Sequence, residues 1–287
     1  CFPKHLELDT NNPPEYLEKA FLSEFGLTFT RICEFINDLG IIAYQESTPF
    51  AAISKSQLFI EINAHDHTYT EDEFNLGLDY LCLFNRGKVY KIPDGFDNID
   101  ISPWRFNRRL SLLRKPLVAV SNPDNSKDPI IYWGFRHLLS TRMYLFDQCM
   151  TNRLRVIEKG AIQKALGKLT QINGTNLVKY VLNELKNDQL IIDSEVFINT
   201  KSELKADKDI GDVDVLVIDQ SSKIIYSLEC KSMAPSRNIK EMVEEVNKLF
   251  GSDSKKGWID KHVGRDEWLK NNLDQLGTKY KLDLSKY

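Results

Sequence analysis

The chain has 287 residues, of which 42% are hydrophobic and 28% charged, and its formal net charge is −3. These values exclude a disordered chain and a strongly basic field for nucleic acid. No apolar run could span a bilayer and no signal peptide is recognisable, so we expect a cytoplasmic protein without a membrane partner. The five cysteines form no Cys-x-x-Cys pair, which favours free thiols in a reducing compartment. The chain begins with Cys1 rather than Met, so we expect a piece of a longer protein.

The first half of the chain is predicted to be helical. Apolar residues recur near a period of 3.6 in four segments, residues 15–26, 29–39, 54–62 and 70–84. Residues 130–150 are apolar almost all round, which predicts a long buried helix. We therefore expect an all-helical N-terminal domain over residues 1–150 that serves recognition or assembly, including a homo-oligomer or a larger complex. A second domain would follow over residues 151–287.

Two of these segments, with residues 87–92 behind them, have the outline of a helix-turn-helix with a wing. The second helix would begin with Thr70-Glu-Asp-Glu73, whose charges repel phosphate. A packing module is therefore favoured over a DNA reader. The triplet His65-Asp66-His67 has metal-ligand residue types, but zinc sites need three or four ligands, so we interpret the triplet as part of a loop.

A basic cluster is predicted in residues 104–115. As a helix, this segment would place Arg105, Arg108 and Arg109 on one face, with Arg114 and Lys115 following. Such a face could contact phosphate, or it could pair with acidic residues between domains. The sequence leaves both alternatives open.

From residue 190 the pattern changes from helices to strands. β-branched residues predict strands at 190–198, 211–218 and 223–231, and the last two are joined by a short polar turn. If the turn centres between Ser221 and Ser222, directly opposed residues have numbers that sum to 443, so Asp214 faces Glu229. Lys231 lies two residues beyond Glu229 and shares its face of the sheet.

Two opposed carboxylates in an apolar hairpin need compensation, because like charges directly opposite each other cost up to about 1 kcal/mol. A hard cation supplies it: Mg²⁺, with Mn²⁺ as a substitute, takes carboxylate and carbonyl oxygens. We expect Asp214, Glu229 and the carbonyl of Cys230 as ligands. Lys231 would then orient a metal-bound water for the in-line hydrolysis of a phosphodiester.

The motifs Gly211-Asp-Val-Asp214 and Glu229-Cys-Lys231 resemble the core of the PD-(D/E)XK nuclease superfamily. The resemblance covers residues 170–250 and implies a restriction-endonuclease-like α/β/α domain with a mixed sheet, so that the whole chain is α+β. It implies a Mg²⁺-dependent endonuclease that cleaves DNA or, less often, RNA, with Asp214, Glu229 and Lys231 in the catalytic positions. A role in restriction or antiviral defence is the setting that it favours.

Members of that superfamily often carry a further glutamate on the helix before the first strand. Glu184 is the main candidate here, ahead of Glu195 and Glu158. The resemblance leaves open a one-metal site if none of the three reaches the metal.

Four basic residues near the predicted site are candidates for contact with nucleic acid. Arg237 and Lys240 lie in the first turn of a helix that we expect to begin after Ser236, to end at Gly251 and to pack its apolar face inward. His262 and Arg265 share one face of the following helix. Each of the four could instead be a solvated or locally paired charge.

Two rivals to the enzyme remain. One is an inactive nuclease-like module that binds nucleic acid or a protein partner, and the other is a structural subunit of a larger assembly. The enzyme predicts turnover that requires Mg²⁺ and Lys231, which the binding module does not. It also predicts affinity for a metal ion, which the structural subunit does not.

Overall fold

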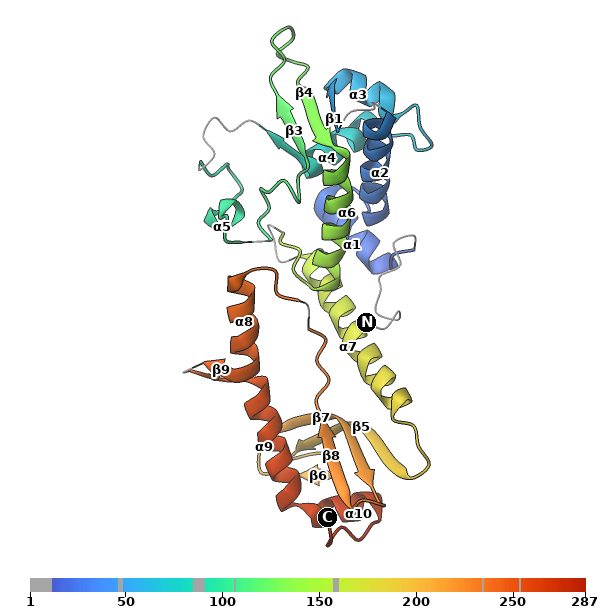
Figure 1. The fold of residues 1–287 in the computed structure, drawn as a ribbon, viewed down its shortest axis with the longest axis vertical. Coiled ribbons are helices and arrows are strands. Elements are labelled where there is room, and N and C mark those ends of the chain that lie inside the picture. The colour runs from blue at the N-terminus through green and yellow to red at the C-terminus, as the bar shows by residue number, and fades with distance from the viewer. Residues whose placement is uncertain are drawn as a thin grey trace. The chain divides into compact units, whose positions relative to one another are not determined.

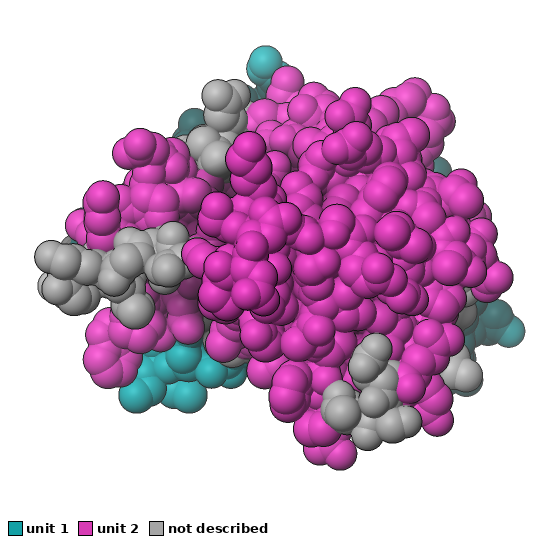
Figure 2. Space-filling model, turned by 90° about the horizontal axis from the view of Figure 1, so that it is seen from above, with its two compact units in different colours: residues 1–6, 171–287 teal, residues 7–170 magenta. Residues whose placement is uncertain are grey.

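The computed structural model describes residues 12–45, 49–84, 91–105, 107–156, 160–233, 235–252 and 254–287. The described residues divide into two compact units, which Figure 2 colours separately: residues 12–170 and residues 171–287. Helices and strands both contribute, so the predicted α+β class is confirmed (Figure 1). None of the described helices combines the length and apolar character that a bilayer crossing requires.

The elements of the N-terminal unit are, in chain order, α1 (Glu15–Phe25), α2 (Phe29–Gln45), β1 (Phe50–Ser54), α3 (Lys55–Ile62), α4 (Glu71–Leu81), β2 (Cys82–Phe84), α5 (Asn98–Ile101), β3 (Leu117–Val120), β4 (Ile130–Gly134) and α6 (Phe135–Met150). The helix α7 (Ala161–Glu184) begins in this unit and ends in the other. The elements that follow it are β5 (Leu190–Asn199), β6 (Leu204–Lys205), β7 (Gly211–Asp219), β8 (Ile224–Leu228), α8 (Ile239–Phe250), β9 (Gly251–Ser252), β10 (Lys255–Lys256), α9 (Trp258–Asn271) and α10 (Leu273–Tyr280).

The N-terminal unit contains a small sheet, so the prediction of an all-helical domain is wrong. Its four strands lie in the order β1-β4-β3-β2, with β2 and β3 parallel and the other pairs antiparallel. The apolar segment 130–150 is strand β4 followed by helix α6. Its first residues, Ile-Ile-Tyr-Trp, are β-branched or aromatic and favour a strand. The indole of Trp133 donates to the Leu39 carbonyl at 3.0 Å and ties this sheet to α2.

The predicted helix over residues 104–115 is also wrong, because the described residues of this segment form turns and irregular chain between α5 and β3. The Arg109 guanidinium donates to the carboxylate of the buried Asp100, and Arg108 donates to the backbone carbonyl of Pro103. These contacts replace the single basic face that helical spacing predicted.

The two helices of the predicted helix-turn-helix are α3 and α4, and both pack into the core of the N-terminal unit. The acidic start of α4 forms a capping box, in which Thr70 and Glu73 satisfy each other's backbone N–H groups. Glu73 also pairs with Arg31 at 3.1 Å. The acidic turn therefore has a structural role, and the predicted wing at 87–92 lies mainly outside the described residues.

The division between the units falls between Thr170 and Gln171, inside α7, rather than near residue 150. The first turns of α7 explain this position, because Ile162, Ala165 and Leu166 are buried in the N-terminal core. We assign the start of α7 to that core by its packing.

The C-terminal unit is built on a four-stranded mixed sheet in the order β6-β5-β7-β8 (Figure 1). The strands β5 and β6 are parallel, whereas β7 is antiparallel to both of its neighbours. Leu269 of α9 and Leu276 of α10 belong to one apolar cluster with Leu216 and Ile218 of β7. These helices therefore cover one face of the sheet, in which β7 is one of the two inner strands.

The helix α8 differs from its prediction in how it packs. It begins after the N-cap Asn238, whose side chain accepts from the Glu241 N–H, rather than at Ser236. It ends at Gly251, as predicted, where φ is 85° and favours glycine. We expected five of its apolar residues to pack inward, but no residue of α8 is buried, and the exposed ones are Met242, Val243, Val246 and Phe250.

Candidate functional site

The hairpin of β7 and β8 has the predicted register. Opposed pairs run from Val215 with Leu228 to Asp219 with Ile224, and the residue numbers of every pair sum to 443. Asp219 sets the turn, because its carboxylate accepts from the backbone N–H and hydroxyl groups of Ser221 and Ser222. These bonds hold the pKa of Asp219 well below its ordinary value. The local turn chemistry therefore fixes which residues meet further along the strands.

Asp214, Glu229 and Lys231 come together just beyond the last pair of this ladder. The Lys231 Nζ lies 2.7 Å from Glu229 Oε1 and 3.6 Å from Asp214 Oδ2. The backbone N–H of Cys230 donates to Asp214 Oδ2 at 2.6 Å, which orients that carboxylate. The side chains of the two acids keep 16% and 18% of their exposure, so solvent still reaches both.

The electrostatics keep Lys231 charged near neutral pH. Burial alone would lower the pKa of Lys231, but its bonds to Glu229 and the charge of Asp214 outweigh that effect and raise the pKa above its ordinary value. Burial, followed by the neighbouring Asp214, raises the pKa of the Cys230 thiol. The thiol therefore stays neutral, which leaves the backbone carbonyl of Cys230 as the ligand that we predict.

The helix α9 supplies an arginine and a histidine to the surroundings of Glu229. The Arg265 guanidinium donates to Glu229 Oε2, and its side chain is only 7% exposed. The His262 Nδ1 lies 3.7 Å from the same oxygen, and its Nε2 lies 3.5 Å from the Ser227 hydroxyl. Both residues were predicted from helical spacing to contact nucleic acid. The structure places them at the carboxylate instead, and contact with nucleic acid stays a prediction.

Arg237, just before α8, and Lys240, in its first turn, lie apart from these contacts. Arg237 pairs with Glu241 at 3.1 Å, which is the local alternative that the sequence left open. Lys240 is exposed on the first turn of the helix. Their predicted contacts with nucleic acid are untested by this arrangement.

The third acidic residue is not assigned by the contacts. Glu184 is exposed at the last residue of α7, and Glu158 lies outside the described residues. Glu195 interrupts the β5–β7 ladder with a φ of 54°. The pairs on either side, Ser194 with Val215 and Val196 with Val213, place it across from Asp214. Of the three candidates, Glu195 therefore has the position in the sheet closest to the acidic pair.

The donor set at this site fits a cation that keeps most of its own water. Within the described residues, no group of three or more His, Cys, Asp or Glu side chains is arranged to hold a metal. Mg²⁺ is usually bound by one or two carboxylates together with waters and substrate phosphates, rather than by an all-protein cage. Asp214 and Glu229, held together by one ammonium group, match the first of these arrangements.

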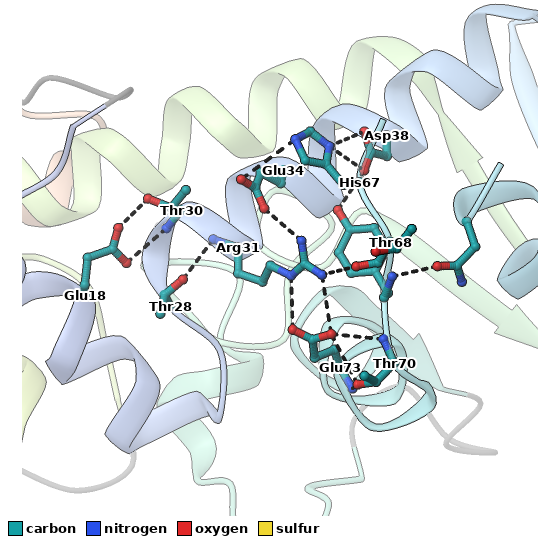
Figure 3. Close-up of polar contacts among 12 residues, drawn as sticks. Glu18, Thr28, Thr30, Arg31, Glu34, Asp38, His67, Thr68, Thr70 and Glu73 are labelled. Carbon is teal, nitrogen blue, oxygen red and sulfur yellow. Dashed lines mark hydrogen bonds and ion pairs between the residues drawn. The ribbon is translucent and has the colours of Figure 1, made fainter. Parts of the chain in front are cut away.

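A second polar cluster, in the N-terminal unit, was missed by the sequence analysis. Asp38 is buried on α2 and accepts from the Tyr69 hydroxyl at 2.7 Å, while His67 Nδ1 lies 3.0 Å from the same carboxylate oxygen. His67 also faces Glu34 at 3.8 Å, and Glu34 pairs with Arg31 at 3.0 Å (Figure 3). These contacts connect the segment before α4 to α2. Their partners lie about 30 residues apart, a separation that local spacing does not reveal.

Comparison with known protein families gives a match. The model of a family described as "Anti-phage protein Upx-like" matches residues 8–281. No curated protein and no solved structure matches the chain. The family match extends across both units and covers the Asp214 site.

Proposed function

The chain belongs to the anti-phage Upx-like family, and from this premise we propose that it is a nuclease that hydrolyses phosphodiester bonds of nucleic acid, DNA rather than RNA. The observation that carries the proposal is the meeting of Asp214 and Glu229 on the single ammonium group of Lys231. A defence setting agrees with the prediction from sequence. The proposal adds the chemistry, and it locates that chemistry at the end of the β7–β8 hairpin.

Each side chain has a task that follows from its contacts. Asp214 and Glu229 would hold Mg²⁺, which when bound lowers the pKa of a water and neutralises charge on a phosphate. The Cys230 N–H keeps Asp214 oriented, and Arg265 does the same for Glu229. Lys231 has three N–H donors, two of which the carboxylates can take, so the third can orient the attacking water or the phosphate.

Contact with the nucleic-acid backbone is proposed for three basic residues around this site. His262 lies beside Glu229, within reach of a phosphate held there. Lys240 and Arg237, at the start of α8, are proposed to contact flanking phosphates. Such contacts position the strand without reading its sequence.

The decisive experiment incubates the full chain with labelled single- and double-stranded DNA and RNA, with Mg²⁺, with Mn²⁺ and with neither. We expect metal-dependent cleavage that Lys231→Ala abolishes while circular dichroism reports an unchanged fold. Lys205→Ala is the matched control, because this exposed lysine lies on the edge strand β6 of the same sheet. Cleavage that survives Lys231→Ala would refute the assignment of the site.

A module that binds nucleic acid without cleaving it is the alternative, and one observation favours it. Arg265 and Lys231 already compensate Glu229, so the acidic pair does not need a metal to be tolerated in the fold. This alternative predicts binding of the same substrates with no turnover under any of the metal conditions.

A further inference from the structure

The N-terminal unit contains a cavity of about 260 Å³ that the proposed nuclease chemistry does not use. It lies between α1, α4 and the irregular segment before β3. Three aromatic and three cationic side chains contribute to its wall: Phe25, Tyr80, Phe96, Arg109, Arg114 and Lys115. The basic cluster that the sequence analysis singled out therefore turns inward, toward a chamber, rather than forming one face of a helix.

One of the three cations is already neutralised. Arg109 makes a two-point contact with Asp100, at 2.9 Å from Nε and 2.5 Å from Nη2. Its guanidinium also lies over the Phe96 ring, 4.4 Å from the centroid. Arg109 and Phe96 therefore form a fixed wall whose charge is balanced inside the protein.

The other two cations, the buried Arg114 and the half-buried Lys115, make no ion pair with a carboxylate among the described residues. The Arg114 residue is 7% exposed, and its Nη1 donates to the backbone carbonyl of Arg155 at 2.6 Å. The Lys115 ammonium donates to the backbone carbonyls of Asp79 and Tyr80. Carbonyl oxygens satisfy N–H groups but carry no net charge. The Asp79 carboxylate, which also lines the cavity, acts on Lys115 only through its charge and forms no ion pair with either cation among the described residues. Glu24 also lines the cavity and makes no ion pair with either cation within the described part of the chain.

The protonation of Lys115 supports the same conclusion. Burial, and then the charge of Arg114, lowers its pKa from the ordinary value to about 8. A bound anion would relieve both effects, because it would return a counter-charge to a region that has lost its water. The cavity therefore favours a negative ligand group close to Arg114 and Lys115.

The remaining wall favours a flat ring. Phe25 and Tyr80 meet nearly edge-on, with centroids 4.8 Å apart and planes at 69°. Together with Phe96 they offer aromatic surface on which a base or another ring can stack. The volume is near the lower end for small-molecule sites, which suits a compact ligand.

We propose that this cavity binds a small anionic ligand of the chemical class of a nucleoside monophosphate, with its phosphate on Arg114 and Lys115 and its base against the aromatic wall. The site is separate from Asp214, Glu229 and Lys231. The inference therefore does not depend on the nuclease proposal.

Calorimetric titration of the full chain with AMP, GMP, CMP and UMP, and with adenosine and inorganic phosphate, tests the proposal. At least one nucleotide should bind with one site per chain. Adenosine and phosphate should each bind at least about tenfold more weakly, because each lacks one of the two recognised parts. Binding by none of the four nucleotides, or binding of phosphate as tight as that of the best nucleotide, would overturn it.

Substitutions locate the site. Arg114→Gln and Lys115→Gln should each weaken nucleotide binding by about tenfold or more, the loss expected for one charge-assisted contact. Arg136→Gln is the matched control, because this exposed arginine lies on α6 of the same unit. Lys231→Ala should leave the affinity unchanged, which separates this site from the nuclease site. If Arg114→Gln does not fold, Lys115→Gln decides, and unchanged affinity in the folded variant contradicts the assignment.

Discussion

Asp100 in the N-terminal unit and Glu229 in the C-terminal unit are both acids that pair with an arginine and a second cation. Asp100 has no exposed surface, and it contacts Arg109 at 2.9 Å and Arg155 at 3.0 Å. Glu229 contacts Arg265 and, at 2.7 Å, Lys231. Judged by their ion pairs alone, the two acids would be assigned the same role.

Their surroundings separate them. Asp100 is a single acid enclosed by two cations, and it also accepts the backbone N–H of Asp97 in a capping box. Glu229 shares its lysine with a second acid, Asp214, and both keep some exposure to solvent. Enclosure with full compensation indicates structure, whereas a second carboxylate with access to solvent leaves oxygens that a ligand can use. The predictions below test this distinction.

The largest expected effect is on cleavage by Asp214→Asn. Asparagine can still accept from the Cys230 N–H, but it removes one charge from the acidic pair. We expect the rate of metal-dependent cleavage to fall by about 10²-fold or more, since a positioned catalytic group typically contributes at least that factor. The free energy of unfolding should stay close to that of the wild type. A gel assay of cleavage and urea unfolding measure the two effects. Asp207→Asn, at an exposed loop position, is the control, and equal cleavage by Asp214→Asn would contradict the proposed role.

Asp100→Asn should show the opposite pattern. It leaves Arg109 and Arg155 enclosed beside a neutral group, so the free energy of unfolding should fall by about 3 kcal/mol, as for a broken buried pair. Burial would raise the pKa of Asp100, but Arg109 outweighs it and the pKa is lowered. The ion pair of Asp100 therefore contributes its full stabilisation of the folded state above the ordinary carboxyl pKa, about 4. This contribution is lost as the pH falls through the lowered pKa of the folded state.

Urea titrations of both proteins across that pH range check this sign. The difference in unfolding free energy between wild type and Asp100→Asn should shrink in acid. A folded Asp100→Asn with unchanged stability and abolished cleavage would overturn the comparison.

The acidic pair was predictable from sequence because its position depends on local chemistry. The turn at Asp219 and the period-2 alternation of a strand together place Asp214 opposite Glu229. The contact between Arg265 and Glu229 was not predictable in the same way. Arg265 lies 36 residues from Glu229, and only the packing of α9 on the sheet brings them together.

The N-terminal sheet was missed for a similar reason. Its strands have three to five residues, and β1 pairs with β4 across about 80 residues of chain. Such short strands carry too few residues to establish a period. Residues 104–115 have helical spacing but turn toward Asp100, which shows a tertiary ion pair overriding a local pattern.

A smaller effect is expected from Arg265→Met, which tests whether Arg265 competes with metal at Glu229. Methionine keeps much of the buried volume but removes the cation, so Glu229 should attract Mg²⁺ more strongly. We expect the Mg²⁺ concentration for half-maximal cleavage to fall up to about tenfold, and calorimetry should show tighter Mn²⁺ binding. Lys261→Met, at an exposed position on the same helix, is the control. A purely structural role would lower cleavage without moving either metal curve.

The smallest expected effect concerns the cavity of the N-terminal unit. Lys115 faces Arg114 and Arg109, the carboxylate of Asp79, and Cys82, whose pKa is raised to about 11 so that its thiol stays neutral. With its pKa near 8, Lys115 loses most of its charge by pH 9, and nucleoside monophosphate affinity should fall about fivefold from pH 7. Lys115→Gln should bind weakly and flatten this profile. Stability should change with pH in the opposite direction to the affinity. Because the lysine holds its proton to higher pH in the unfolded chain than in the folded one, the free energy of unfolding should rise between pH 8 and 10. A pH-independent affinity in wild type would show that the Lys115 ammonium does not face the phosphate.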